Sequence, residues 1–230
     1  MKTVGIIGGM GTLATIDLFN KIALETNAKS DDEHLHILID NNAQIPDRSN
    51  FILKNGENPT NELIKSAKNL EQIGADFLAI PCNTAHYFYD FINDNVDIEV
   101  INMIEETAKI IKESKVSKVV LLATTGTIKA KVYDNIFKSY NIEIVKPNDF
   151  KQNIIMNFIY NIKKGKSDIN KEEIIKTFNY FKEENLYNII LGCTELPIGV
   201  KMLGIEENFI DPTKILAKAC VKKAKEETWF

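Results

Sequence analysis

The sequence predicts an α/β protein with two pseudo-symmetric domains, each a mostly parallel sheet flanked by helices, and an active site in the cleft between them. Three observations lead to this fold class. Short apolar strands alternate with helices along the chain, which is the order that parallel sheets require. A strand, a turn of small residues and a helix follow one another in both halves. In each half a buried strand is followed by a cysteine, Cys82 or Cys193.

The first half begins with the apolar strand Val4–Ile7, which ends in the turn Gly8-Gly9-Met10-Gly11. Apolar residues at helical spacing predict a helix over Thr12–Thr26. After the strand His34–Asp40, a long loop over Asn41–Pro59 is expected. The elements predicted next are a helix Asn61–Ile73, a strand Phe77–Ile80, a helix from about Asn83 to Asn93 and a strand Glu99–Ile101.

The second half repeats this order. After the helix Ile104–Glu113, the strand Lys118–Ala123 ends in the turn Thr124-Thr125-Gly126-Thr127. The remaining predicted elements are the helix Ile128–Tyr140, the strand Ile142–Val145, the helix Phe150–Ile162, a basic turn Lys163–Ser167, the helix Lys171–Glu184, a strand before Cys193, and a closing helix Pro212–Lys225 with Asp211 as its cap.

Two segments of the first half correspond in kind to two of the second. VGIIGGMGTLAT matches VVLLATTGTIKA, and GADFLAIPCNTA matches LYNIILGCTEL. The turn precedes its cysteine by about seventy residues in each half, a period that suits two related domains rather than a solenoid. We therefore expect an N-terminal domain over 1–102 and a C-terminal domain over 103–211, with the last helix (about 212–230) packing back on the first domain.

The composition is that of an ordinary globular protein, with 44% hydrophobic and 26% charged residues. A formal net charge of -4 argues against nucleic acid or an anionic membrane as a partner. The amino terminus lacks the pattern of a signal peptide, and no apolar stretch approaches the roughly 18 residues of a membrane span. The three cysteines are expected as reduced thiols in the cytoplasm, and their spacing does not suggest a metal site.

Cys82 and Cys193 each lie between the end of a strand and the start of a helix, where parallel sheets bind ligands. Helix N-termini favour a thiolate and can hold a carboxylate. If an amino acid binds between the two cysteines, one thiolate can take its α-proton while the other thiol protonates the opposite face. The alternative is that both are ordinary cysteines of the hydrophobic core. We interpret Cys220 in this way.

At these residues the chain resembles the aspartate/glutamate racemase family, in particular its aspartate racemase branch with the broad-specificity amino-acid racemases. The motifs that carry the resemblance are GGMG (8–11), PDR (46–48), PCNTAH (81–86), ATTGT (123–127) and GCTELP (192–197). The resemblance implies a racemase of small acidic amino acids that needs no cofactor and uses Cys82 and Cys193 as its acid/base pair. It also implies association as a homodimer.

The resemblance places five residues around the α-carboxylate and amino group of the substrate: Met10, Asn83, Thr84, Thr125 and Thr194. It assigns the side-chain carboxylate to Arg48, whose guanidinium suits this role, and to Lys164, with Lys163 and Lys166 as alternatives. Glu195 is expected to tune the Cys193 thiol or to contact the substrate ammonium, although acids are also favoured in the first turn of a helix.

Several alternatives stay open. Gly9–Ala14 reads G-x-G-x-x-A after a strand and allows a dinucleotide-binding oxidoreductase, but Asp40 lies well beyond the expected spacing of about twenty residues. A non-catalytic carboxylate-binding protein can use the same scaffold. Hydantoin racemase, maleate isomerase and arylmalonate decarboxylase also resemble the chain, and residue types do not distinguish aspartate, glutamate and broad specificity.

Overall fold

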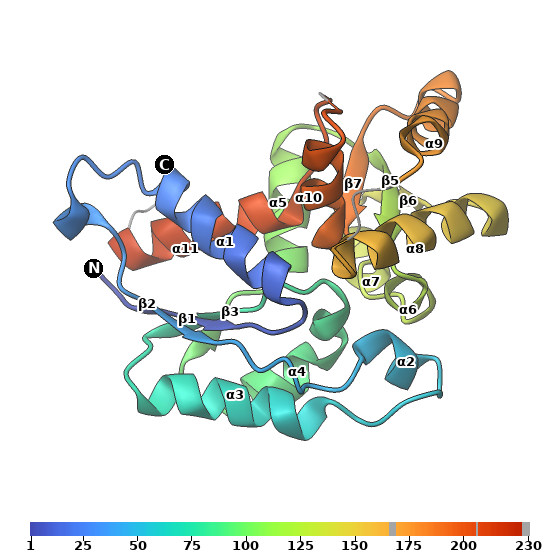
Figure 1. Ribbon diagram of the computed structural model, residues 1–230. Helices are drawn as coiled ribbons and strands as arrows, with labels where there is room; N and C mark the ends of the chain where they lie inside the picture. The colour runs from blue at the N-terminus through green and yellow to red at the C-terminus, as the bar shows by residue number, and fades with distance from the viewer. Residues whose placement is uncertain (166–168, 206, 227–230) are drawn as a thin grey trace.

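Two sheets with parallel strand pairs form the frame of the computed structural model, which describes residues 1–165, 169–205 and 207–226 (Figure 1). The strand order is β2-β1-β3-β4 in the first sheet and β6-β5-β7 in the second, so the order β2-β1-β3 recurs as β6-β5-β7. The strands are β1 Val4–Ile7, β2 Ile37–Asp40, β3 Phe77–Ala79, β4 Glu99–Val100, β5 Lys118–Ala123, β6 Glu143–Val145 and β7 Ile189–Gly192. This topology confirms the predicted α/β class.

Helices connect these strands, as parallel pairing requires. In the first half they are α1 Thr12–Glu25, the 3₁₀ turn η1 Asp31–Glu33, α2 Arg48–Ile52, α3 Thr60–Gln72, the 3₁₀ turn η2 Thr84–Phe88 and α4 Tyr89–Asn93, and α5 Met103–Glu113 then leads into the second half. In the second half they are α6 Thr125–Lys129, α7 Asp134–Ser139, α8 Asp149–Lys163, α9 Lys171–Glu183, α10 Glu195–Met202 and α11 Pro212–Lys225.

Both faces of the first sheet are buried. Figure 1 shows α1 and α11 on one face of this sheet and α3 on the other. Successive residues of β3 accordingly belong to different clusters, because side chains alternate across a strand. Phe77 and Ala79 lie in the cluster that includes α1 and α11, whereas Leu78 and Ile80 lie in the cluster that includes α3.

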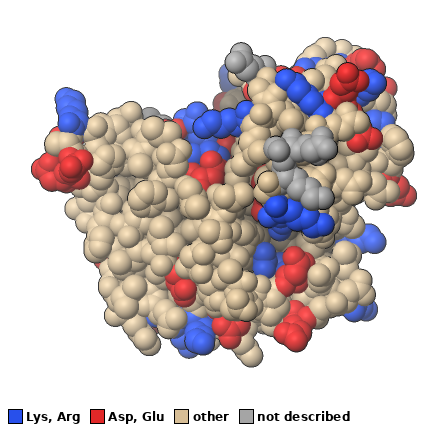
Figure 2. Space-filling view, in the orientation of Figure 1, with Lys and Arg blue, Asp and Glu red and all other residues tan. Residues whose placement is uncertain are grey.

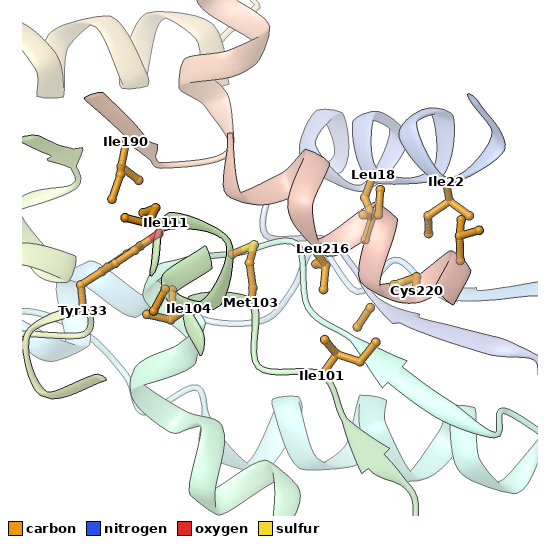
Figure 3. Close-up of a cluster of buried hydrophobic side chains, with 14 of the residues drawn as sticks. Leu18, Ile22, Ile101, Met103, Ile104, Ile111, Tyr133, Ile190, Leu216 and Cys220 are labelled. Carbon is orange, nitrogen blue, oxygen red and sulfur yellow. The ribbon is translucent and has the colours of Figure 1, made fainter. Parts of the chain in front are cut away.

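The cluster on the α1 side continues into the second half of the molecule. It joins Leu18 and Leu216 to Tyr133 and Ile190, which come from the second half (Figure 3). Helix α11 packs against both α1 and α5, and the Lys2 N–H donates to the Ala224 carbonyl oxygen at 2.8 Å. The last described helix therefore lies across the two halves and holds the first sheet close to the second.

Three elements differ in kind from the sequence prediction. The expected helix from about Asn83 to Asn93 is formed by the 3₁₀ turn η2 and the short helix α4. The expected loop over Asn41–Pro59 contains the short helix α2, because the Asp47 carboxylate caps it by accepting the Asn50 N–H at 2.7 Å. The expected single helix over Ile128–Tyr140 is divided into α6 and α7, and the chain between them passes through Lys131 with φ at 54°. The predicted cap of α11 is confirmed, since the Asp211 side chain accepts two N–H groups of the first turn. None of the helices in the described ranges combines the length and apolar character of a membrane span.

Candidate active site

A small cavity lies where the carboxyl ends of strands from both sheets meet. Residues from both halves line it: Met10, Asp47, Arg48, Ser49, Cys82, Asn83, Thr84, Thr124, Lys163, Cys193, Thr194 and Glu195. This is the position at which open parallel sheets bind their ligands. The described residues include no cluster of three or more potential metal ligands from His, Cys, Asp and Glu.

Cys82 and Cys193 line the same cavity from opposite halves. Cys82 lies shortly after β3, and Cys193 directly follows β7. Both are free thiols and nearly buried, with exposed fractions of 6% and 5%. Cys220 is also a free thiol, but it is fully buried in the core around α11, away from the cavity. The two cysteines singled out by their positions in the sequence are therefore brought to one site.

Glu195 gives Cys193 an environment that Cys82 does not have. The Cys193 thiol donates to Glu195 Oε2 at 3.0 Å, and the Thr194 hydroxyl donates to the same oxygen at 3.3 Å. Burial, together with the nearby Glu195 charge, raises the pKa of Cys193 well above its usual value. Cys193 is therefore held as a neutral thiol, which is the form that donates a proton.

Lys163 is the cation that faces this carboxylate. Its Nζ lies 3.7 Å from Glu195 Oε1. Burial alone lowers the pKa of Lys163, but the nearby Glu195 carboxylate acts in the opposite direction, and the net pKa is raised. The lysine is therefore an ammonium inside the cavity. Glu195 also reaches toward the first half, because a β-carbon built on Gly11 would lie 3.7 Å from its Oε1.

Arg48 is buried, and most of its donors bind the backbone. Its Nη1 donates to the carbonyls of Ile45 and Pro46 at 3.1 and 2.9 Å, and Nη2 donates to the Met10 carbonyl at 3.2 Å. These bonds tie the glycine turn to the loop before α2. The Nε of Arg48 and the Nδ2 of Asn83 are buried without a hydrogen-bond partner among the described residues. Unpaired buried donors are unfavourable, so the cavity is suited to a guest with acceptor oxygens.

Hydroxyl groups join the two halves beside Cys82. The Thr84 hydroxyl lies 3.1 Å from that of Thr124 and 2.8 Å from that of Thr127. The Ser49 hydroxyl donates to Thr124 at 3.2 Å. Helices α2 and α6 approach closely here, because a β-carbon on Gly126 would be only 2.7 Å from the Ser49 hydroxyl oxygen. The turn that carries Cys82 is therefore held by groups of the opposite half.

The structure brings eight of the ten predicted site residues to the cavity: Met10, Arg48, Cys82, Asn83, Thr84, Cys193, Thr194 and Glu195. Thr125 does not line it, because its hydroxyl lies 3.3 Å from the Gln152 side-chain nitrogen, and the preceding Thr124 takes the place in the wall. Lys164 does not line it either: it borders a separate surface depression with Tyr160 and Asn161.

Lys163 lies in the cavity in place of Lys164 because consecutive helical residues point about 100° apart. A signal for this was present in the sequence. Lys163 follows Ile159 by four residues and therefore lies on the buried side of α8. The other alternative, Lys166, is outside the described residues. Asp47, Ser49 and Thr124 also line the cavity, although the sequence reading did not select them.

Comparisons with known proteins agree with this arrangement. The model of the Asp/Glu/hydantoin racemase family matches residues 7–220. The chain is 28% identical to the broad specificity amino-acid racemase RacX of Bacillus subtilis, over 95% of this chain and 96% of that protein. The structure of an aspartate racemase from Picrophilus torridus is 34% identical, with a TM-score of 0.87 and coverage of 98% of this chain and 95% of that chain.

A second solved structure, an aspartate racemase homologue from Pyrococcus horikoshii, is 27% identical with a TM-score of 0.78. It covers 98% of this chain and 100% of that chain. Together with the family match over most of the length, these similarities support the fold described above. The chain belongs to the Asp/Glu/hydantoin racemase family and is an enzyme of the isomerase class.

Proposed function

We propose that this enzyme interconverts L- and D-aspartate, or L- and D-glutamate, without a cofactor, by proton transfer between two thiols. The observation that carries the proposal is that Cys82 and Cys193 line one cavity from opposite halves. An α-carbon held between them has a sulfur on each face, which is what inversion by two bases requires. The names of the similar aspartate racemases support an acidic substrate.

The environment of Cys193 supports a proposed order of proton transfers. With Cys82 as thiolate, it takes the α-proton, and Cys193 gives its thiol proton to the opposite face of the planar intermediate. Cys82 is then the thiol and Cys193 the thiolate, and reaction from the other enantiomer runs through the same states in reverse. The Lys163 ammonium, 3.7 Å from Glu195, balances the negative charge that develops beside Cys193.

The charges of the cavity favour an acidic amino acid. The Arg48 guanidinium and the Lys163 ammonium are two cations in a wall that also holds the free Asn83 amide donor. A dicarboxylate can pair with both cations, whereas Asp47 and Glu195 offer oxygens for the substrate ammonium. The resemblance to RacX keeps a broader range of amino acids as the second candidate.

The test is incubation with single L-amino acids in D₂O, without pyridoxal phosphate. We expect deuterium at the α-carbon of aspartate or glutamate and formation of the D-enantiomer. Cys82→Ala and Cys193→Ala should each abolish interconversion, because each removes one of the two bases. Cys220→Ala is the matched control and should keep the activity. Wild-type rates in either of the first two variants would refute the two-base assignment.

Two features of organisation belong to the same proposal. We propose domains over 1–102 and 103–211 with α11 packed back on the first, supported by the repeated strand order of the two sheets. We also propose a homodimer, supported by apolar side chains that α1 exposes: Leu13, Ile16 and Phe19.

A further inference from the structure

Tyr133 lies behind the cavity, outside its lining, and its hydroxyl donates to Oδ1 of Asn83. Tyr133 is fully buried in the cluster that also holds Ile104 and Ile190 (Figure 3). Its ring packs edge-on against Phe137, with the ring centroids 5.1 Å apart. A buried phenol needs a partner for its hydroxyl group. Here the partner is a side chain of the opposite half, next to Cys82.

This hydrogen bond decides which end of the Asn83 amide is free. Because Oδ1 accepts from Tyr133, the Nδ2 group is left as the available end. Asn83 is 2% exposed and lines the cavity, and its Nδ2 is buried with no partner among the described residues. A buried donor without an acceptor is unfavourable, so this group is suited to an oxygen atom of a guest.

We propose that Tyr133 is a positioning residue for substrate binding, which holds Asn83 so that its Nδ2 group donates to a carboxylate oxygen of the bound amino acid. The inference rests on the proposed function and deepens it. Without the Tyr133 hydroxyl, the Asn83 amide can turn over and present its oxygen, which repels a carboxylate.

The phenol is well suited to this role because it stays protonated. Burial raises the pKa of Tyr133 well above its usual value. The Tyr133 hydroxyl therefore keeps its proton and can donate to Asn83 Oδ1.

The test compares two variants, each of which lacks the hydroxyl group of one tyrosine. Tyr133→Phe should raise KM for aspartate about tenfold and leave kcat within about twofold, because one hydrogen bond to a charged substrate is weakened. The inhibition constant of succinate, a dicarboxylate without an α-proton, should rise by the same factor. Tyr89→Phe is the matched control, since the Tyr89 hydroxyl donates to the Val100 carbonyl at 2.9 Å, and it should change neither constant.

A double-mutant cycle separates this role from a structural one. If Tyr133 acts through Asn83, Asn83→Ala should bind succinate as weakly as Asn83→Ala combined with Tyr133→Phe. An unchanged KM and inhibition constant in Tyr133→Phe, or effects of the two substitutions that multiply, would overturn the inference. Should Tyr133→Phe not fold, the side-chain amide signals of Asn83 in wild-type NMR spectra decide: they should move when succinate is added, and fixed signals at saturation contradict the inference.

These measurements distinguish the two proposals. Succinate binding does not depend on proton transfer. An enzyme whose succinate binding weakens in Tyr133→Phe but whose wild type exchanges no α-proton would contradict the proposed function and support the role of Tyr133. Racemisation with a Tyr133→Phe variant of unchanged KM would contradict only the role of Tyr133.

Discussion

Lys163 and Lys164 are chemically identical neighbours, and the rotation of one helix separates their roles. Lys163, the last residue of α8, lies in the cavity with its ammonium 3.7 Å from Glu195 Oε1. Lys164 borders a different depression on the surface. We therefore propose that Lys163, rather than Lys164, has the binding role at this helix end. The pair also provides a variant and its control within two adjacent positions.

We expect Lys163→Ala to raise KM for aspartate by about ten- to a hundredfold, because it removes from the cavity wall a cation that can pair with a carboxylate. Lys164→Ala should leave KM within about twofold, since an exposed charge contributes little. Steady-state kinetics in both directions of the reaction check this. Equal effects of the two substitutions would mean that the ammonium of Lys163 does not contact the substrate.

Residue types predicted which cysteines line the cavity but not which lysine does, and the reasons are physical. Cys82 and Cys193 follow strands, and the carboxyl ends of parallel strands lie at the same edge of a sheet. Lys163 and Lys164 differ by about 100° around α8, and only the buried positions Ile155, Ile159 and Ile162 show which side faces inward. The role of Arg48 as a link between Met10, Ile45 and Pro46 depends on tertiary contacts that no local pattern contains.

At the scale of elements, His86 joins η2 to the amino end of α5. Its Nε2 accepts the Met103 N–H at 3.1 Å, so its Nδ1 carries the proton and donates to the Cys82 carbonyl at 2.9 Å. Burial lowers the pKa of His86 to about 4. The imidazole is therefore neutral in the folded enzyme, and protonation breaks the bond from Met103.

This gives a prediction for stability against pH. The folded pKa of about 4 lies below the ordinary 6.5, so between these values the unfolded chain binds more protons than the folded one. The contribution of His86 is complete above pH 6.5 and is lost as the pH falls toward 4. Between pH 7 and pH 5 we expect a loss of about 2 kcal/mol from this residue.

Urea unfolding of the wild type and of His86→Asn at pH 7 and pH 5 measures this loss of stability. Asn keeps a donor for the Cys82 carbonyl and does not titrate, so the variant should be less stable at pH 7 but lose less stability on acidification. The same pH dependence in both proteins would show that His86 is not the titrating group. His34→Asn is a suitable control, because His34 is exposed.

Elements with a clear apolar period and a capping residue were predictable from the sequence. Elements whose bounds depend on the backbone conformation of one residue were not. The strand Lys118–Ala123 and the helix Pro212–Lys225 have the predicted bounds. The predicted helix over Ile128–Tyr140 fails at Lys131, where a lysine adopts a φ of 54° that the apolar period does not reveal. This break matters for the site. Tyr133, the N-cap residue of α7, follows the break, and its hydroxyl donates to Asn83.

At the scale of the whole molecule, the repeat in the sequence predicts two halves but not how firmly they are joined. One buried cluster contains Leu18 of α1, Val119 of β5 and Leu216 of α11, so the two halves share a core. The hydroxyl contacts of Thr84 with Thr124 and Thr127 cross the same boundary beside the cavity. Site geometry is therefore coupled to the packing of α11, which has no counterpart in the internal repeat.

The outer face of α1 is the surface on which the proposed homodimer can be tested. Leu13, Ile16 and Phe19 are 45%, 57% and 44% exposed, and Met202 of the adjacent α10 is 53% exposed. Figure 2 shows a broad area of uncharged residues on the side of the molecule where α1 lies. Apolar side chains at this spacing on one helix face are typical of an interface, because single copies rarely expose such patches.

We expect size-exclusion chromatography with light scattering to give a mass near twice 26.1 kDa for the wild type at micromolar concentration. Ile16→Glu places a charge in the middle of the α1 face and should shift the mass toward a single chain, because burying an unpaired carboxylate is strongly unfavourable. Phe150→Glu, at an exposed aromatic residue of α8, is the matched control and should leave the mass at the dimer value. A single-chain mass for the wild type, or a dimer that persists in Ile16→Glu, would rule out this face as the interface.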